Sequence, residues 1–75
     1  MSFQGYLNTI RDKTGKDAAG LRAWADGKGF SQAGLIKPEV KAGAVVAAAK
    51  EEMGLGHGHA MAIVALLKGA KKAGD

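Results

Sequence analysis

Glycine residues divide this chain into four segments, each with the composition of a short helix. Gly15, Gly54 and Gly69 each follow a helix-forming run, where a glycine can take the left-handed conformation that ends a helix. Gly27 and Gly29 are expected to end the second run in the same way. The chain is therefore predicted to be all-α, with four short helices arranged as two helical hairpins.

The first two segments carry apolar side chains at helical spacing. Four of them form the i, i+3, i+4, i+7 stripe of an amphipathic helix, namely Phe3, Tyr6, Leu7 and Ile10. Ser2 is suited to cap this helix, and Asp17 is suited to cap the second. The second helix is expected to turn three side chains inward: Leu21, Trp24 and Ala25.

The middle of the chain is predicted to be a loop followed by a third helix. Residues 29–37 form the loop, and three of its apolar side chains are expected to pack under the core: Phe30, Leu35 and Ile36. Pro38 suits the first turn of a helix, so the third helix is expected over residues 38–53. No strand is expected, because the β-branched pairs of the chain stand in alanine- and leucine-rich surroundings.

The fourth helix is expected to begin near His57 and to close around Gly69. One apolar stripe runs along it, formed by Ala60, Ile63, Val64 and Leu67. Its partner, the third helix, is rich in glycine and alanine, which lets another helix approach closely.

Length and composition indicate one small soluble domain. The 75 residues, of which 47% are hydrophobic and 24% charged, allow a single core over about residues 2–69, with a tail over 70–75. The longest uncharged run, residues 53–67, is too short and too polar at one end to span a bilayer. No signal peptide is apparent and cysteine is absent, so a cytoplasmic protein without membrane contact is expected.

The glycine turn between the last two helices is the candidate binding site. Gly54 is expected to be left-handed, and Leu55 to enter the core. Gly56 and Gly58 leave no side chain over the start of the fourth helix, where unpaired backbone N–H groups carry the positive end of the helix dipole. The candidate anion-binding residues of the turn are Gly54, Gly56, His57, Gly58 and His59.

The same turn resembles the helix-hairpin-helix motif of nucleic-acid-binding proteins. That motif places Gly-hydrophobic-Gly before three variable residues, an alanine and further small or apolar positions, and the matching residues here are Gly54, Leu55, Gly56, Ala60, Ala62 and Ile63. The resemblance implies weak contact with the DNA backbone without sequence reading. Where the motif often has lysine, this chain has His57, Gly58 and His59, and neutral imidazoles add little to phosphate binding.

A broader resemblance covers residues 2–69. The segments SFQGYL, IRDKTGK and GLGHGHAMAIVALLKG, in this order, are similar to a family of small bacterial domains of unknown function. The resemblance implies a bacterial cytoplasmic protein, sometimes attached to another domain, and it implies no catalytic residue and no cofactor.

Lysines are the remaining candidates for contact with an anion. The net charge is +4, and residues 53–74 contain no acidic residue. Lys13 and Lys16 flank Gly15 and are candidates for a second backbone contact. Lys68 lies roughly 15 Å along the fourth helix from the turn, so it would serve a different phosphate. The anion could be DNA, RNA, a nucleotide or a protein carboxylate.

The residue types favour neither catalysis nor metal binding. His57 and His59 would project to different sides of a helix, and no third histidine or cysteine is available, so no metal site is expected. Glu51 and Glu52 are adjacent and lie on different helical faces, and no nucleophile stands beside a base. The alternative to nucleic-acid binding is a protein-interaction module that forms a homodimer or docks a neighbouring domain.

Overall fold

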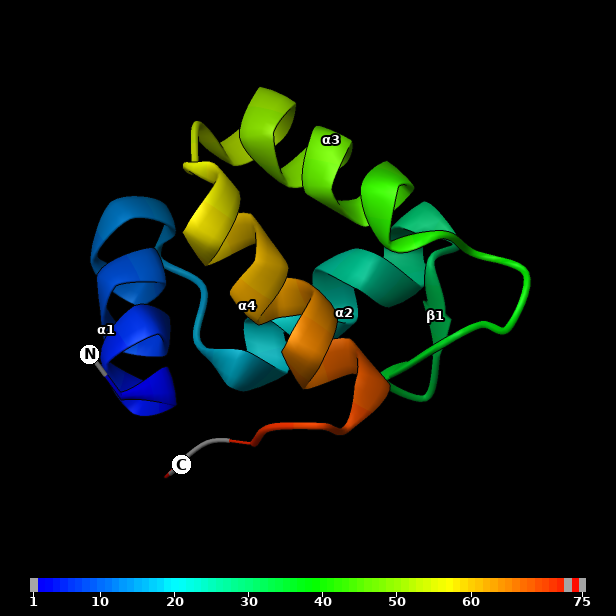
Figure 1. The fold of residues 1–75 in the computed structure, drawn as a ribbon, viewed down its shortest axis with the longest axis horizontal. Helices are drawn as coiled ribbons and strands as arrows, with labels where there is room; N and C mark the ends of the chain where they lie inside the picture. The colour runs from blue at the N-terminus through cyan, green and yellow to red at the C-terminus, as the bar shows by residue number, and fades with distance from the viewer. Residues whose placement is uncertain (1, 73, 75) are drawn as a thin grey trace.

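The computed structural model describes residues 2–72 and 74, which form four helices and one small two-stranded sheet (Figure 1). The elements are α1 (Phe3–Thr14), α2 (Ala18–Lys28), β1 (Ser31–Gln32), β2 (Leu35–Ile36), α3 (Ala42–Met53) and α4 (His57–Lys68). The prediction of four short helices is confirmed. None of the described helices is long and apolar enough to cross a membrane.

Side-chain caps begin the first two helices as the sequence predicts. The Ser2 hydroxyl accepts a hydrogen bond from the Gly5 N–H at 3.1 Å, and the Asp17 carboxylate accepts one from the Gly20 N–H at 2.8 Å. Each bond satisfies one of the N–H groups that a helix start leaves without an intrahelical acceptor.

Left-handed glycines end all four helices. The φ angles are 77° at Gly15, 80° at Gly29, 65° at Gly54 and 76° at Gly69. Gly27 differs from the prediction, because it lies inside α2, which continues to Lys28. One left-handed residue is enough to end a helix, and Gly29 supplies it.

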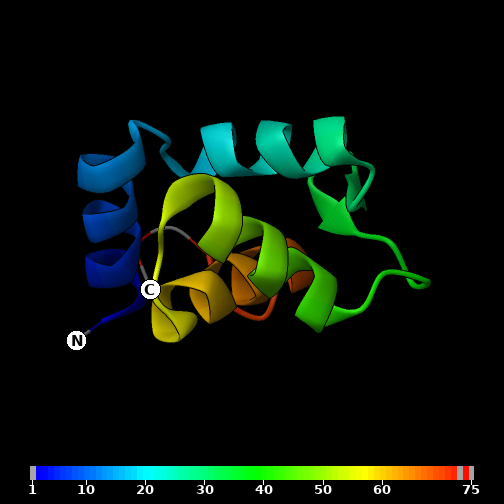
Figure 2. The ribbon, with the colours of Figure 1, turned by 90° about the horizontal axis from the view of Figure 1, so that it is seen from above.

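Helix α4 is the centre of the core. Six of its side chains are buried: Ala60, Ala62, Ile63, Val64, Leu66 and Leu67. Helix α3 lies along α4, whereas α1 and α2 each contact α4 instead of lying alongside each other (Figures 1 and 2). Leu7, Ile10, Leu21 and Ala25 reach the core from α1 and α2, while Trp24 is only partly buried.

A β-hairpin replaces the predicted loop between α2 and α3. Ser31 pairs with Ile36 and Gln32 with Leu35 in antiparallel register. The two connecting residues, Ala33 and Gly34, have φ angles of 54° and 81°, the positive pair that a two-residue type I′ turn requires. The expectation of a strand-free chain is therefore wrong at these four residues.

The hairpin also changes the position of Leu35. Ile36 and Phe30 pack against the core as expected, but Leu35 is 56% exposed. Successive side chains of a strand point to opposite sides, so Leu35 and Ile36 cannot both face the core.

The third helix starts four residues later than predicted. The Val40 N–H donates to the Lys37 carbonyl at 3.0 Å, which closes a turn with Pro38 at its second position. Proline fits that position of a turn as well as it fits a first helical turn. Lys41 is extended, with φ −88° and ψ 144°, and α3 begins at Ala42.

A partly buried polar cluster holds the hairpin to α2. The Asp26 carboxylate accepts hydrogen bonds from the Ser31 hydroxyl and from the Gly34 N–H, the latter at 3.1 Å. The Arg22 guanidinium donates to the Gly34 carbonyl. The Ser31 bond, followed by the Gly34 bond, lowers the pKa of Asp26 below its usual 3.8. Gly34 is thus held through both its N–H and its carbonyl.

Replacing Gly34 by alanine should destabilise the protein more than the same change at Gly15. Both residues are left-handed, but a Cβ at Gly34 would lie 2.9 Å from Arg22 Cδ, whereas one at Gly15 meets nothing within 4 Å. We expect Gly15→Ala to cost about 1 kcal/mol and Gly34→Ala about 2–3 kcal/mol in thermal or urea unfolding. Equal losses would show that Arg22 does not restrict the turn.

Candidate functional site

The turn from α3 to α4 has the local structure that the sequence predicts. Gly54 is left-handed, and its N–H donates to the Lys50 carbonyl at 3.1 Å, which completes the end of α3. Leu55 is 3% exposed and belongs to the core. A buried leucine between two exposed glycines fixes the path of the chain, so the start of α4 has a defined position.

The first backbone N–H groups of α4 are unpaired within the part of the chain that the structure describes. Gly56 is the N-cap, with φ −73° and ψ 168°, and it has no side chain to cap the helix. The first intrahelical bond runs from the Ala60 N–H to the Gly56 carbonyl at 3.0 Å. The N–H groups of His57, Gly58 and His59 have no acceptor among residues 2–72 and 74.

These N–H groups lie at an open surface. Gly56, His57 and Gly58 are exposed, and a Cβ built at either glycine would meet no atom within 4 Å. An incoming oxygen atom would therefore meet the helix start without displacing a side chain. Backbone N–H groups at such a position suit a phosphate or carboxylate.

His59 has a structural role that the sequence did not indicate. Its ring packs edge-on against Tyr6 of α1, with the ring centroids 5.0 Å apart and the planes at 76°. Its Nε2 atom is buried and has no hydrogen-bond partner among the described residues. The imidazole therefore fastens α4 to α1, and the N–H of His59, rather than its ring, is the group available at the helix start.

The candidate lysines are not gathered around this helix start. Lys68 is the last residue of a 12-residue helix that begins at His57, so it lies roughly 16 Å away. Lys13 is in the last turn of α1, and Lys16 is in the connection to α2. Lys16 lies close enough to Glu52 for its charge to lower the pKa of that carboxylate. Five of the eight candidate residues thus lie together in the turn, whereas the three lysines lie apart from it.

Glu52 links α2 to the end of α3, close to the glycine turn. Its carboxylate accepts a hydrogen bond from the Trp24 indole N–H at 3.3 Å and pairs with the Lys28 ammonium at 2.5 Å. These contacts, that of Lys28 first, lower the pKa of Glu52 below its usual 4.5. The sequence contains no signal for this group, because Glu52 is 24 or more residues from both of its partners along the chain.

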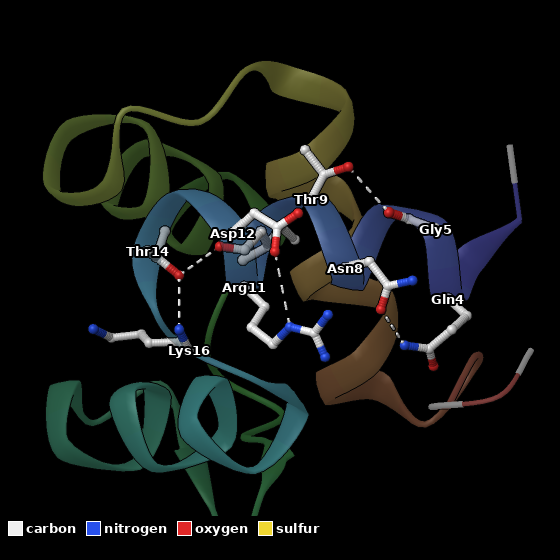
Figure 3. Close-up of polar contacts among 9 residues, drawn as sticks. Gln4, Gly5, Asn8, Thr9, Arg11, Asp12, Thr14 and Lys16 are labelled. Carbon is white, nitrogen blue, oxygen red and sulfur yellow. Dashed lines mark hydrogen bonds and ion pairs between the residues drawn. The ribbon is translucent and has the colours of Figure 1, made fainter.

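A shallow cleft lies between α1 and the start of α2. It has a volume of about 220 Å³ and is lined by Gln4, Leu7, Asn8, Arg11, Asp17, Ala18 and Ala19. Figure 3 shows that the polar side chains of α1 near it make local contacts: Gln4 donates to Asn8 at 2.9 Å, and Arg11 lies 4.0 Å from Asp12. The side-chain Oε1 atom of Gln4 also accepts a hydrogen bond from the Gly74 N–H at 2.7 Å. No pattern in the sequence indicates this cleft.

Comparison with known proteins identifies a family whose function is unknown. The family model described as Domain of unknown function (DUF4287) matches residues 2–69. No curated protein and no solved structure matches the chain. Within the described residues, no three His, Asp or Glu side chains are grouped so that they could hold a metal ion.

Glu52 should make part of the stability depend on pH. Because the folded-state pKa of Glu52 is lowered, its contribution is present above about pH 4.5 and is lost as the pH falls through the folded-state value. Glu52→Gln should therefore be less stable than the wild type at pH 7 and should lose less stability between pH 7 and pH 3, as measured by urea unfolding followed by Trp24 fluorescence.

Glu51→Gln is the matched control for this substitution. Glu51 is exposed and has no partner among the described residues, so its loss should leave the pH dependence close to that of the wild type. The same pH dependence in all three proteins would contradict a role of the Glu52 contacts in stability.

Proposed function

Since this chain belongs to the DUF4287 family, whose function is unknown, we propose a function from the site itself. The protein is a non-catalytic module that binds the phosphate backbone of nucleic acid weakly and without sequence preference. The ligands are the backbone N–H groups at the start of α4, over residues 56–59. The observation that carries the proposal is the absence of an acceptor for three of these groups at an open surface, among the residues described.

The packing around the turn supports the resemblance to the helix-hairpin-helix motif. Helices α3 and α4 lie along each other and are joined by Gly54, Leu55 and Gly56. The motif-matching residues of α4, Ala60, Ala62 and Ile63, are buried, as an apolar side chain at those positions should be. A helix start held in place by its own core can present N–H groups to a phosphate without first becoming ordered.

The distribution of charge indicates that binding is weak. Lys50, in the last turn of α3, is the lysine nearest to the turn along the chain. Lys68 is at the far end of α4, and Lys16 lies in the connection before α2, where it acts electrostatically on Glu52. With about one or two phosphates neutralised, the affinity should fall only gently with salt, because each neutralised phosphate contributes a slope of about 0.9 in log K against log salt.

A binding role without catalysis fits the partners of the hydroxyl and imidazole groups. Ser2 caps α1, Ser31 donates to Asp26, and His59 packs on Tyr6. A nucleophile needs a base within hydrogen-bond reach, and neither serine has a histidine partner among the described residues. We therefore propose that the module acts by binding alone.

A protein-interaction module is the second candidate. The outer side of α3 exposes Gly43, Ala44 and Ala47, while Val45, Val46 and Ala49 face the core. A second copy or a neighbouring domain could approach such a face closely. Sedimentation at high protein concentration separates the two candidates, because a dimer that ignores DNA would favour this one.

Substitution of Gly58 should separate binding from folding. The residue is exposed, a Cβ there meets no atom within 4 Å, and a carboxylate in the first helical turn is compatible with the dipole. Gly58→Glu should therefore retain or slightly raise thermal stability, while its charge should reduce affinity for labelled duplex DNA at low salt at least about tenfold.

Gly58→Gln is the control, since glutamine has nearly the same shape and no charge. It should retain affinity within about threefold if the loss in Gly58→Glu is electrostatic. Amide chemical shifts of residues 56–59 should move on titration with duplex DNA. A flat titration, or shifts confined to other parts of the protein, would contradict the proposal.

A further inference from the structure

We propose that the β-hairpin is a second binding surface, which docks a protein whose apolar pocket is ringed by acidic side chains. The surface consists of the hairpin tip, residues 32–35, with Leu35 as its anchor, and of a basic rim formed by Arg22, Lys37 and Lys68. This role is separate from phosphate binding at the start of α4. Each residue of the surface is within the described part of the chain.

The tip is held rigidly even though it is not part of the core. The Asp26 carboxylate accepts hydrogen bonds from Ser31 and Gly34, and Arg22 donates to the Gly34 carbonyl. Ser31, at the base of the hairpin, is only 3% exposed. Phe30 and Ile36 already cover the core from this connection. The hydrogen bonds to Gly34 hold the tip, which lies outside the core.

The tip also contains the one non-glycine residue with a positive φ angle among residues 2–72 and 74. Ala33 has φ 54°, a conformation that costs an alanine about 1–2 kcal/mol. Such strain persists only where the surroundings enforce it, and it is concentrated at sites where a fixed shape is needed. Here the enforced turn sets the direction of the next side chain, Leu35.

Leu35 is the most exposed large apolar side chain of the described residues, at 56%, against 40% for Met61. A single exposed leucine is ordinary on a protein surface. This one stands on a rigid turn and close to the end of α4, because a Cβ on Gly69 would lie 3.9 Å from Leu35 Cδ2. A fixed apolar side chain that projects into water is suited to fill a pocket on a partner.

The charges beside Leu35 indicate the chemistry of that partner. Arg22 contacts the tip directly, Lys68 precedes Gly69, and Lys37 follows β2 and acts electrostatically on Asp26. The Asp26 carboxylate keeps its negative charge and offsets one of these three cations, so the surroundings of Leu35 remain net positive. An acidic ring would complement them. A phosphate backbone would complement the rim but offers no apolar pocket for Leu35, so a protein is the favoured partner.

Selection from a displayed random peptide library tests this inference with a defined probe. Peptides are selected on the wild-type protein and depleted on Leu35→Ser, and the affinity of those enriched is measured by calorimetry. We expect enriched peptides to combine a large apolar residue with several Asp or Glu. Their affinity should fall at least about tenfold in Leu35→Ser and about threefold in Lys68→Gln.

Two further variants distinguish a binding role from a structural one. Met61→Ser removes the other exposed large apolar side chain and should leave the affinity unchanged. Ser31→Ala removes one hydrogen bond of the group that holds the tip, without changing any charge and with Leu35 in place, and it should lower affinity because the tip is less ordered. Leu35→Ser should melt at the wild-type temperature, because Leu35 contributes little to the core.

Other outcomes would overturn the inference. These are the absence of Leu35-dependent peptides, enriched peptides without acidic residues, and chemical shifts that move away from residues 31–37. Concentration-dependent dimers lost in Leu35→Ser would identify a second copy as the occupant, and hairpin shifts caused by duplex DNA would identify nucleic acid. Gly58→Glu should bind the peptides as the wild type does, so failure here is distinguishable from failure of phosphate binding.

Discussion

Six side chains of α4 are buried, and they provide the surface against which the other three helices pack. Burial of an aliphatic side chain such as Ile63 or Leu67 is worth about 1.5–3 kcal/mol, so this helix accounts for much of the apolar stabilisation of a 75-residue chain. Apart from the exposed Met61, a helix buried to this extent can meet solvent or a ligand mainly at its two ends. The binding properties of the protein should therefore be sought at the start and the end of α4.

The two ends of α4 are built differently. At the start, glycine removes side chains and leaves N–H groups exposed, and the buried Leu55 holds the turn in place. At the other end, α4 contacts the hairpin, where Arg22 and Asp26 hold a strained turn, and Lys68 is the last residue of the helix. The first end offers backbone dipoles and the second offers cationic side chains beside an apolar anchor. These surfaces differ in the ligands that they can recognise, although both favour negative charge.

The helices and the glycine turn could be predicted from the sequence because the signals are local. A serine or aspartate cap, an apolar stripe and a left-handed glycine act within one or two turns of the chain, and their effects at Ser2, Asp17 and Gly54 appear as expected. The hairpin was missed because its turn contains alanine where a type I′ turn normally has glycine, asparagine or aspartate. The contact that stabilises this turn comes from Asp26, on the preceding helix, and no local pattern shows it.

The surroundings of the candidate lysines could not be predicted either, because they too depend on contacts between distant parts of the chain. The sequence indicates that Lys13, Lys16 and Lys68 lie at or beside helix ends. It does not indicate which groups from other helices surround each lysine, because that depends on how the helices pack. Lys16 acts electrostatically on Glu52 of α3, and Lys68 lies at the end of α4 that contacts β2, away from the glycine turn. Separating cations from the exposed N–H groups keeps the affinity of the turn for any anion low. A module of this kind would gain useful affinity only when two of its surfaces, or two linked copies, bind together, since linkage multiplies weak affinities.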